Sequence, residues 1–432
     1  MAEGLPSFFG DETIEEGRPP LSDRIDVPLG LEGFEVMSTE VVGDVLEVHV
    51  RSTRRAACHH CGSVDVTGHG CNERRIRDRS CAFPTVLRWR QRRFMCVDCG
   101  KTCRERHPEL AGRRSITNRF RQRLFERACG EPITDVASSE GVSAYRVDEA
   151  FEHHAATALV DRNIEPPRVL AIDESAFRKR FRFHTVFSDP ERGNIIDLVE
   201  GRGKGSIYGG LAAMSDQVRA HIETVVMDCH WPYRQAIEVV LPNVRVVADK
   251  FHVIRSVDAA AHRVRIRHGR RIRVVGRDGG LARQKNPRFM PGVWRSRWAF
   301  MKRASKLNHQ DADALQPIFE ALPEVGIAWM LKEQFALIYD APDRIEAERR
   351  LELWLDQITA AGIPEFLNTW RTLQWWREQI LNYFDDRVTN AFAEGITDKI
   401  KVMKRRSYGF RDPMRYRQKV LLSCCRRPSQ RG

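Results

Sequence analysis

Long apolar runs are missing from this sequence of 432 residues. The longest, VVM at 225–227 and VRVVA at 244–248, fall far short of the roughly 18 residues that a membrane-spanning helix needs. Internal repeats and low-complexity tracts are also absent, which excludes a repeat architecture. The beginning, MAEGLPSFFGDETIEEG, is acidic and lacks an apolar stretch of signal-peptide length. We therefore expect a protein of the reducing cytoplasm.

Acidic residues are fewer than basic residues. The chain has 71 Lys and Arg against 58 Asp and Glu, a formal net charge of +13, and 42% of its residues are apolar. A chain with this apolar share can bury a core, so disorder throughout is excluded, and the length predicts about three domains. The eleven cysteines indicate metal ligands and scattered core thiols, because a disulfide framework does not persist in a reducing compartment.

The hydrophobic period changes along the chain. Residues 1–30 have no sustained period and predict a loosely ordered lead-in. Alternation over 33–50, around Gly43-Asp44, and again over 85–96 predicts a small β module, and helical spacing from 115 to 154 predicts three helices. The order β-β-β-α-β-α-β is then expected. It has three strands at 166–177, 183–190 and 194–201, a helix at 206–221, a strand at 223–228, a helix at 231–240 and a strand at 244–249. Helices are expected from about 251 to 386 and over 388–406.

Two CxxC pairs stand out, Cys58-His59-His60-Cys61 and Cys96-Val97-Asp98-Cys99, each followed by Gly. Two such turns can supply the four thiolates of a tetrahedral Zn²⁺ site, which would hold the module together and leave no open position for chemistry. The 34 residues between the pairs, 62 to 95, exceed the roughly 15–20 that are usual, so we expect a longer ribbon hairpin. His59, His60, Cys71 and Cys103 are alternative ligands, and unrelated buried cysteines are the alternative interpretation.

Arginines surround the cysteine pairs, and they predict a DNA-facing ribbon because phosphate neutralisation needs many cations on one surface; a solvated charged face is the alternative. They are Arg54, Arg55, Arg74, Arg75, Arg77, Arg79, Arg88, Arg90, Arg92 and Arg93. Downstream, a small Ala137, Gly141 at a turn and Ser143 as N-cap follow the order of a helix-turn-helix. A helical hairpin without a DNA role would look similar. Its second helix holds Tyr145 and Arg146 but also two acids, so Arg113 and Arg114 fit DNA-backbone contacts better.

Three carboxylates lie at informative positions. Asp173 ends the run VLAI, Asp228 ends VVM, and Glu394 lies on a helix with Thr397, Lys401 and Arg405, opposite an apolar face. Two strand-end aspartates and a helical carboxylate can hold two Mg²⁺ ions through oxygen ligands, and such ions can activate an attacking water or 3′-hydroxyl at a phosphodiester. A capping Asp and a solvated helix face are the ordinary alternatives. Asp249 is an alternative to Asp228 as the second metal-binding carboxylate, and Glu174 is an alternative to Asp173 as the first.

The chain resembles bacterial insertion-sequence transposases of the ISL-three type. The most specific pieces are Cys58 to Cys61, the strand Val169 to Ser175, the runs Asp228 to Tyr233 and Ala248 to Val253, and Glu394 to Lys401 with Arg405 to Phe410. The resemblance covers about residues 31 to 416. It implies a multidomain α+β and α/β protein with an N-terminal zinc ribbon, a helix-turn-helix, and an RNase H-like catalytic core of the DDE class interrupted by an all-α insertion.

On this resemblance the domains run as follows: a lead-in at 1–30, a zinc-ribbon DNA-binding module at 31–110, a helix-turn-helix at 111–160, the first part of the core at 161–254, the insertion at 255–386, and the catalytic helix and tail at 387–432. Zinc is expected on Cys58, Cys61, Cys96 and Cys99, although Cys103 stands where the family commonly has an aromatic residue.

The resemblance also assigns roles to residues. It implies that Asp173, Asp228 and Glu394 are the catalytic triad that binds Mg²⁺ or Mn²⁺. Asp249 and His252 form a DxxH element with a supporting role, and a structural histidine is nearly as good an account. The basic run 262–273 is expected to hold DNA. The expected DNA-binding residues are Arg92, Arg93, Arg113, Arg114, Tyr145, Arg146, Arg265, Arg267, Arg270, Arg271, Lys401 and Arg405.

The function that follows from the resemblance is a DNA transposase. It would bind the terminal inverted repeats of an insertion sequence and cut and join strands, in the bacterial cytoplasm near the nucleoid, as a homo-oligomer on double-stranded DNA that includes the target. A non-catalytic DNA-binding regulator with the same ribbon and helix-turn-helix is one alternative. A structure-selective nuclease of the same fold is the other, and it would cut without joining.

Overall fold

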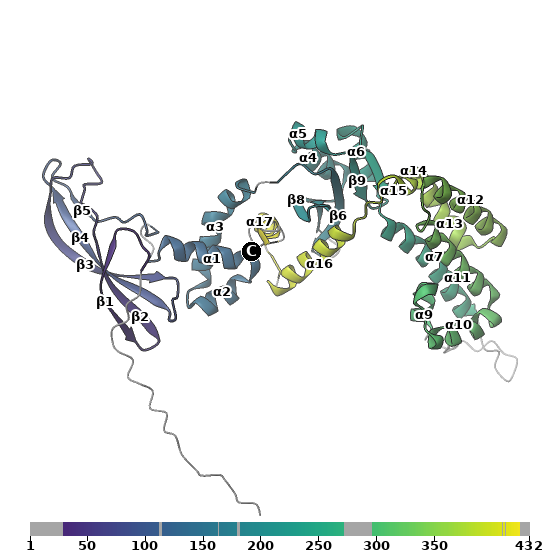
Figure 1. Ribbon diagram of the computed structural model, residues 1–432, viewed down its shortest axis with the longest axis horizontal. Coiled ribbons are helices and arrows are strands. Elements are labelled where there is room, and N and C mark those ends of the chain that lie inside the picture. Colours follow the sequence, from purple (N-terminus) through teal and green to yellow (C-terminus); the bar gives the residue numbers. More distant parts are fainter. Residues whose placement is uncertain are drawn as a thin grey trace, which may run out of the picture. The chain divides into compact units, whose positions relative to one another are not determined.

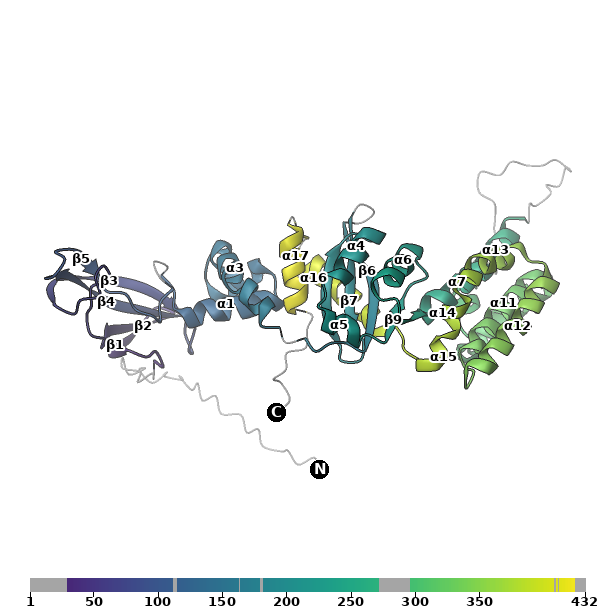
Figure 2. The ribbon, with the colours of Figure 1, turned by 90° about the horizontal axis from the view of Figure 1, so that it is seen from above.

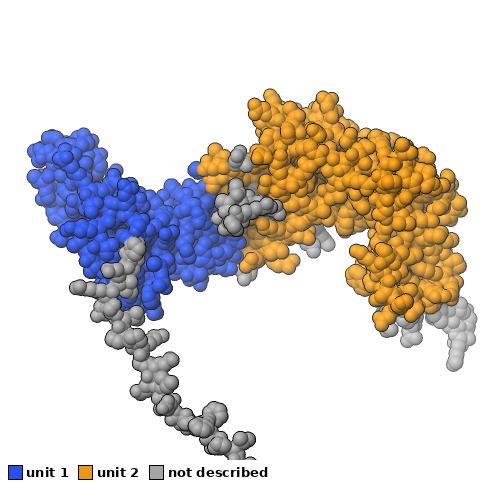
Figure 3. All heavy atoms as spheres, in the orientation of Figure 1, with its two compact units in different colours: residues 1–157 blue, residues 158–432 orange. Residues whose placement is uncertain are grey.

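The computed structural model describes residues 29–111, 115–162, 164–178, 182–271, 296–407, 409–410 and 412–423. The chain divides into two compact units, residues 1–157 and 158–432 (Figure 3). The expected lead-in over 1–30 falls almost entirely outside the described residues, as do Arg113 and Arg114. Among the described helices, none combines the length and apolar character that crossing a membrane requires.

The first unit begins with a five-stranded sheet. Its order is β1-β2-β4-β3, with β5 paired to β4; β2 and β4 run parallel, and the other pairs are antiparallel. The strands are β1 Phe34–Val42, β2 Val45–Ser52, β3 Val66–Asp78, β4 Thr85–Cys96 and β5 Thr102–Arg104. The expected turn at Gly43-Asp44 is confirmed, because Val42 pairs with Val45 and Gly43 takes φ +60°, a conformation that glycine adopts at little cost.

The alternation in β2 and β4 produces the core of this sheet. Val48 and Val50 on β2 are buried with Leu87 and Trp89 on β4. Successive residues of a strand point to opposite faces, so the intervening Arg88 and Arg90 turn outward; Arg88 pairs there with Glu47 and Glu73. The predicted long ribbon is confirmed as the β3–β4 hairpin, which ends at Cys96.

Three helices follow the sheet, as the helical spacing predicts. They are α1 Asn118–Gly130, α2 Ile133–Glu140 and α3 Ala144–Val160. The hydroxyl of Thr117 caps α1 by accepting from the N–H of Phe120, and the hydroxyl of Ser143 accepts from the N–H of Arg146 at the start of α3. Gly141 ends α2 in the left-handed conformation with φ +63°. The short connection between α2 and α3 therefore follows from a glycine stop and a serine start.

The second unit contains the other sheet, of order β10-β9-β6-β7-β8. Strands β6, β9 and β10 are parallel, and β7 and β8 continue the sheet antiparallel. Its elements are β6 Val169–Arg178, β7 Arg182–Asp189, β8 Asn194–Glu200, α4 Lys204–Ala212, α5 Asp216–His221, β9 Thr224–Met227, α6 Trp231–Val240 and β10 Arg245–Ala248. The expected element order is confirmed, except that the stretch 206–221 forms two helices.

Helices cover both faces of this sheet (Figures 1 and 2). Helices α4 and α6 pack on one face, where Ile172 and Phe187 meet Leu211 and Ile237. On the other face lie α16 Ala391–Arg406 and α17 Pro413–Ser423. The near-continuous apolar runs of β6 and β9 reflect this, because strands buried on both faces need apolar residues at every position.

The chain between β10 and α16 is helical, as predicted, in its described part. It comprises α7 Lys250–Arg271, α9 Arg297–Met301, η1 Ala304–Lys306, α10 His309–Ala321, α11 Pro323–Ile338, α12 Arg344–Ala361, α13 Pro364–Leu373, η2 Gln374–Trp376, α14 Arg377–Leu381 and α15 Tyr383–Asp386. Helix α7 packs against α11 and α13. Buried aromatic side chains fill this bundle, and the indole N–H of Trp354 donates to the carbonyl of Leu331 at 2.8 Å.

Candidate functional site

Two turns of the first unit bring four cysteines together. In each turn a glycine with positive φ donates its N–H back to the first cysteine: Gly62 to the carbonyl of Cys58 and Gly100 to that of Cys96. The sulfur atoms of Cys58, Cys61, Cys96 and Cys99 lie within 4.8 Å of one another. The Sγ–Sγ distances are 3.7 Å for Cys58 and Cys99 and 3.5 Å for Cys61 and Cys96.

The chemistry of this cluster fits Zn²⁺, which takes four thiolates in a tetrahedral site. Backbone N–H groups of Cys61 and His60 lower the pKa of Cys58 to about 6, whereas hydrogen bonding among the thiols and burial raise the pKa of Cys61 and Cys99, so one thiol of the cluster loses its proton first. Of the alternative ligands, Cys103 is buried beside the cluster and Cys71 accepts a hydrogen bond from Arg90. The rings of His59 and His60 contact each other at a tilt of 38°, with their centroids 4.4 Å apart. The compact set of four cysteines is the one that the CxxC spacing predicts.

Strand register in the second unit aligns three aspartates. Ile172 pairs with Met227, and Met227 pairs with Ala248, so the next residue of each parallel strand lies at the same edge of the sheet. Those residues are Asp173, Asp228 and Asp249. The backbone N–H of Asp249 donates to the carbonyl of Met227 at 2.8 Å, which extends the ladder to this level.

Asp173 and its neighbour Glu174 point to opposite faces of β6. Asp173, 8% exposed, accepts the hydroxyl of Thr397 on α16 at 2.6 Å and the N–H of Glu174 at 2.7 Å. Burial raises the pKa of Asp173, and the nearby Asp228 raises it further, against the lowering effect of those donors. Glu174 instead accepts the hydroxyl of Tyr233 at 3.1 Å, from the face that α6 covers.

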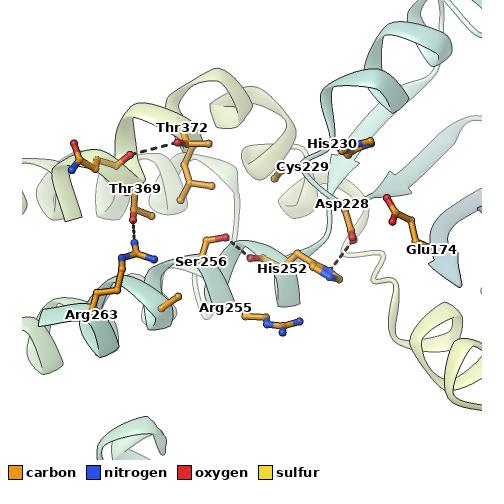
Figure 4. Close-up of a pocket in the computed structure, with 13 residues that line it drawn as sticks. Glu174, Asp228, Cys229, His230, His252, Arg255, Ser256, Arg263, Thr369 and Thr372 are labelled. Atoms are coloured by element: carbon orange, nitrogen blue, oxygen red, sulfur yellow. Dashed lines mark hydrogen bonds and ion pairs between the residues drawn. The ribbon is translucent and has the colours of Figure 1, made fainter. Parts of the chain in front are cut away.

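His252 joins the other two aspartates. Its Nδ1 lies 2.8 Å from Asp228 Oδ1 (Figure 4). The same nitrogen lies 2.8 Å from Asp249 Oδ2. These contacts raise the pKa of His252 to about 10 although burial opposes this. Asp249 is 2% exposed and also faces the backbone N–H of Asn390 at 3.4 Å, whereas Asp228 is a quarter exposed. The DxxH spacing therefore puts an acid and a base in contact, with Asp228 nearer to solvent.

Glu394 approaches from the first turn of α16. Burial raises the pKa of Glu394, and the negative charges of Asp249, Asp173 and Asp228 raise it further. Glu394 is therefore close enough to these three carboxylates to interact with them electrostatically. The predicted apolar face of α16 is confirmed: Ile396 and Ile400 are buried against β6 to β8 and α17. Asp228, Asp249 and His252 have ligand atoms that all lie within 4.8 Å of one another. Asp173 and Glu394 are outside that group and are connected to it by electrostatic effects on their pKa values. Carboxylate oxygens are the ligands that suit a hard divalent cation such as Mg²⁺.

A cavity of about 570 Å³ opens beside the aspartates. Glu174, Asp228 and His252 lie at one end of it, and side chains of α7 and α13 line the rest (Figure 4). We define the acidic cluster as Asp173, Asp228, Asp249, His252 and Glu394. Of these residues, Asp228 and His252 line the cavity, so the cluster is accessible through them.

The expected DNA-binding residues of the first unit have different surroundings. Arg92 pairs with Glu105 at 2.5 Å and donates to the carbonyl of Arg54, and Arg93 is half-buried. Tyr145 is 78% exposed at the start of α3, and the adjacent Arg146 is half-buried. Tyr145 is therefore the most accessible of these candidates.

The basic run on α7 needs a correction. Arg265 is 2% exposed, with its guanidinium 3.3 Å from His262 Nδ1, and Arg267 pairs with Glu324 and Glu365. The structure does not support DNA contacts by these two side chains, because Arg265 is buried and Arg267 is held by Glu324 on α11 and Glu365 on α13, whereas Arg255 and Arg263 of the same helix are exposed. The side chains of Arg270 and Arg271 lie outside the described residues. Lys401 and Arg405 on α16 are exposed, and Lys401 pairs with Asp398.

Two residues that support the site were not singled out from the sequence. Thr397 donates to Asp173, and Tyr233 donates to Glu174. Helical spacing put Thr397 on the face of Glu394, which was the only available signal. The contact of Tyr233 depends on how α6 packs on the sheet, and no local pattern encodes that.

Comparisons with known proteins point to one family. A family model described as a transposase, of the DDE type named after ISL3, matches residues 170–420. The transposase for insertion sequence element IS1001 of Bordetella parapertussis is 24% identical over 391 residues, which cover 89% of this chain and 93% of that protein. The transposase for insertion sequence element IS1557 of Mycobacterium tuberculosis is 24% identical over 256 residues, 57% of each chain. The family match spans β6, β9, β10 and α16, which carry the acidic cluster.

Proposed function

We propose that this chain, which belongs to the ISL3 family of insertion-sequence transposases, binds the ends of an insertion sequence and cuts and joins DNA strands by metal-dependent phosphoryl transfer. One observation carries the proposal beyond family membership. The register of β6, β9 and β10 aligns Asp173, Asp228 and Asp249, and α16 brings Glu394 within electrostatic range of all three.

Asp173, Asp228 and Glu394 are the proposed metal-binding triad. A bound divalent cation would supply charge stabilisation at the phosphoryl oxygens and activation of the attacking oxygen. Asp228 is preferred over Asp249 because it lines the cavity, whereas Asp249 is nearly inaccessible. Asp249 and His252 then hold Asp228 in place, and Thr397 orients Asp173 through its hydroxyl.

The fold assignments that go with this function are also proposals. The order β10-β9-β6-β7-β8, with two antiparallel strands beside three parallel ones, supports an RNase H-like core. On that assignment, the core occupies 161–254 and continues at 387–432, and the helices between them are an insertion. The ribbon at 31–110 and the helices at 111–160 would be separate DNA-binding modules.

Those two modules are proposed to recognise the terminal inverted repeats. Zn²⁺ on Cys58, Cys61, Cys96 and Cys99 would fix the end of the ribbon, and α2 and α3 would act as a helix-turn-helix with the exposed Tyr145 at the start of its second helix. The net charge of +13 supports salt-sensitive binding of double-stranded DNA. Homo-oligomers that pair two ends, and the capture of target DNA, complete the proposal.

The test is cleavage of DNA that carries the element's own flanking repeats, with Mg²⁺, by the wild type and by Asp228→Asn. The wild type should nick at the repeat boundary. The variant should bind the same DNA equally well and cut at least about 10²–10³-fold more slowly, the usual cost of losing one electrostatic stabiliser. Asp216→Asn is the matched control, because Asp216 is an exposed residue on α5 of the same unit.

The other outcomes separate the alternatives. Binding without cutting by the wild type, over varied metal and salt, would favour a non-catalytic regulator. Cutting of branched DNA without specific ends, and without strand joining, would favour a structure-selective nuclease. If Asp249→Asn abolished cutting and Asp228→Asn did not, the preference for Asp228 would be wrong.

A further inference from the structure

The cavity beside the acidic cluster extends away from the sheet, between α7 and α13. His252, Arg255, Ser256, Ala259 and Arg263 line it from α7. Counted from His252 they stand at positions i, i+3, i+4, i+7 and i+11, so they form one continuous stripe on that helix. Asn368, Thr369, Thr372 and Leu373 line it from α13. Figure 4 shows Asp228 and Glu174 at one end and Arg263 with Thr369 at the other. We call this space the α7–α13 pocket.

The charge of the pocket changes from end to end. Its two carboxylates, Glu174 and Asp228, are both at the sheet. Its two guanidinium groups belong to Arg255 and Arg263, which are exposed residues of α7. Within the described part of the chain neither arginine forms an ion pair; Arg263 donates only to the hydroxyl of Thr369, at 3.0 Å. An anion that entered the pocket could therefore reach guanidinium groups that are not neutralised by carboxylates.

The contrast with Arg267 on the same helix supports this view. Arg267 lies one turn beyond Arg263 and is held by Glu324 and Glu365, with a contact of 2.6 Å to the latter. Arg263 and Arg267 belong to the same basic helix. Within the described residues only Arg267, which does not line the pocket, has carboxylate partners. If the protein only had to neutralise the positive charge of α7, carboxylates would be expected beside Arg263 as well as beside Arg267.

The dimensions suit a strand of nucleic acid. Arg255 and Arg263 are eight residues apart, about 12 Å along the helix axis. They can therefore contact two different phosphates of one strand, because phosphates rise about 3.4 Å each along the axis of B-form DNA and lie farther apart along the winding strand itself. Ala259 lies between them and leaves room because its side chain is a single methyl group. Across the pocket, α13 contributes the side-chain amide of Asn368, which can donate to phosphate and sugar oxygens. The hydroxyls of Thr369 and Thr372 also line the pocket, and they donate to backbone carbonyls of α13.

We propose that the α7–α13 pocket binds the sugar–phosphate backbone of the DNA strand that is cut, over the first few nucleotides on one side of the scissile phosphate. Arg255 and Arg263 contact phosphates, and the polar groups of α13 contact the backbone between them. The inference rests on the proposed function, because that function places the scissile phosphate at the acidic cluster. It makes the helical region part of the substrate site.

The experiment measures the salt dependence of binding, with the full-length protein, DNA that carries one element end, and no added divalent metal. Each neutralised phosphate contributes a slope of about 0.7–0.9 to the plot of log Kobs against log salt concentration. Arg255→Ala and Arg263→Ala should each reduce the slope by about one contact, and the double variant by about two. Arg349→Ala, an exposed arginine of α12 that does not line the pocket, should leave it unchanged.

A second measurement locates the contact. Single phosphates near the cleavage point are replaced by uncharged methylphosphonates, one at a time. A replacement within a few nucleotides of that point should weaken binding by the wild type and have no further effect on Arg263→Ala, since the lost contact is the same one. Both arginines are exposed, so these variants should fold.

The outcomes keep this inference separate from the proposed function. Unchanged slopes in both arginine variants, an equal effect of Arg349→Ala, or coupling only to distant phosphates would each overturn the pocket assignment. The binding slopes do not depend on cleavage. A wild type that never cuts at element ends would therefore overturn the proposed function, while a wild type that cuts, with arginine variants that bind like it, would overturn only the pocket.

Discussion

The cysteine cluster and the acidic cluster are two candidate metal sites built in different ways. The four cysteines lie on two tight turns at the end of one hairpin, and each turn is closed by its own glycine. The acidic cluster takes residues from three strands and two helices, and its contact between Asp173 and Thr397 spans 224 positions of the chain. Local turns build the first site, whereas the packing of the whole second unit builds the other.

This difference parallels what each site can do. Four thiols that all lie within 4.8 Å of one another leave no position for a substrate, so the cysteine cluster suits a structural ion. The acidic cluster opens onto a cavity of about 570 Å³ and includes a histidine between two aspartates. In a site assembled from distant elements, the packing of those elements holds the side chains in place. One side of the site can therefore remain open to a substrate.

The largest expected effect tests the closed site. Cys96→Ser removes one of four thiolates, and structural zinc contributes an apparent 10–16 kcal/mol, roughly, to the folding of small zinc modules. We expect loss of bound zinc and unfolding of the β3–β5 end of the ribbon. Metal analysis and limited proteolysis of the first unit measure this, with the second unit as an internal reference.

Cys71→Ser is the matched control for that experiment. Cys71 is an exposed cysteine of β3 that contacts Arg90 and lies outside the cluster of four. It should keep full zinc content. Retention of one equivalent of zinc and of the native proteolysis pattern by Cys96→Ser would show that the four cysteines do not form a structural metal site.

Much of the local structure was predictable from the sequence because short-range rules determine it. The turn at Gly43-Asp44 and the long β3–β4 hairpin follow from alternation and glycine positions. The strand ends before Asp228 and Asp249 follow from two short apolar runs that each stop at an aspartate. The four cysteines follow from spacing. Helix α16 was predictable from its apolar face, which also indicated that Glu394 and Thr397 lie together.

The rest depended on long-range packing that the sequence pattern does not encode. Asp173 and Glu174 could not be told apart until the covering of β6 by α16 on one face and α6 on the other was known. Asp249 resembled Asp228 by motif, and only burial distinguishes them. Arg265 looked like a DNA contact because charged residues are usually exposed, yet the bundle buries it.

The next effect tests how the first unit joins its sheet to its helices. Asp78, at the end of β3, is fully buried and accepts from the hydroxyl of Thr117 at 2.6 Å and from Arg119 Nε at 2.8 Å. Asp78→Ala removes the carboxylate partner of Arg119, which keeps its bonds to the carbonyls of Leu29 and Gly30 and is 22% exposed. The cost should therefore lie below the roughly 3–5 kcal/mol of a fully buried broken pair. We expect the melting temperature of the first unit to decrease and that of the second unit to stay unchanged.

Glu126→Ala on α1 is the comparison for Asp78→Ala. Glu126 is exposed and accepts only from Gln122 among the contacts that the structure describes, so its loss should change stability by about 0.5 kcal/mol or less. Calorimetry of both variants measures the difference. Equal melting temperatures would mean that the buried pair is not what attaches α1 to the ribbon.

The smallest effect tests the open site. Thr397→Val keeps the shape of the side chain but removes the 2.6 Å hydrogen bond to Asp173 Oδ2, and loss of a donor to a buried acceptor costs about 1–3 kcal/mol. We expect a small decrease in the stability of the second unit and slower cleavage, with recovery of both in Thr397→Ser. Wild-type cleavage by Thr397→Val would mean that strand register alone positions Asp173. The acidic cluster would then be held by backbone geometry, as the cysteine cluster is, and the contrast between the two sites would be one of accessibility only.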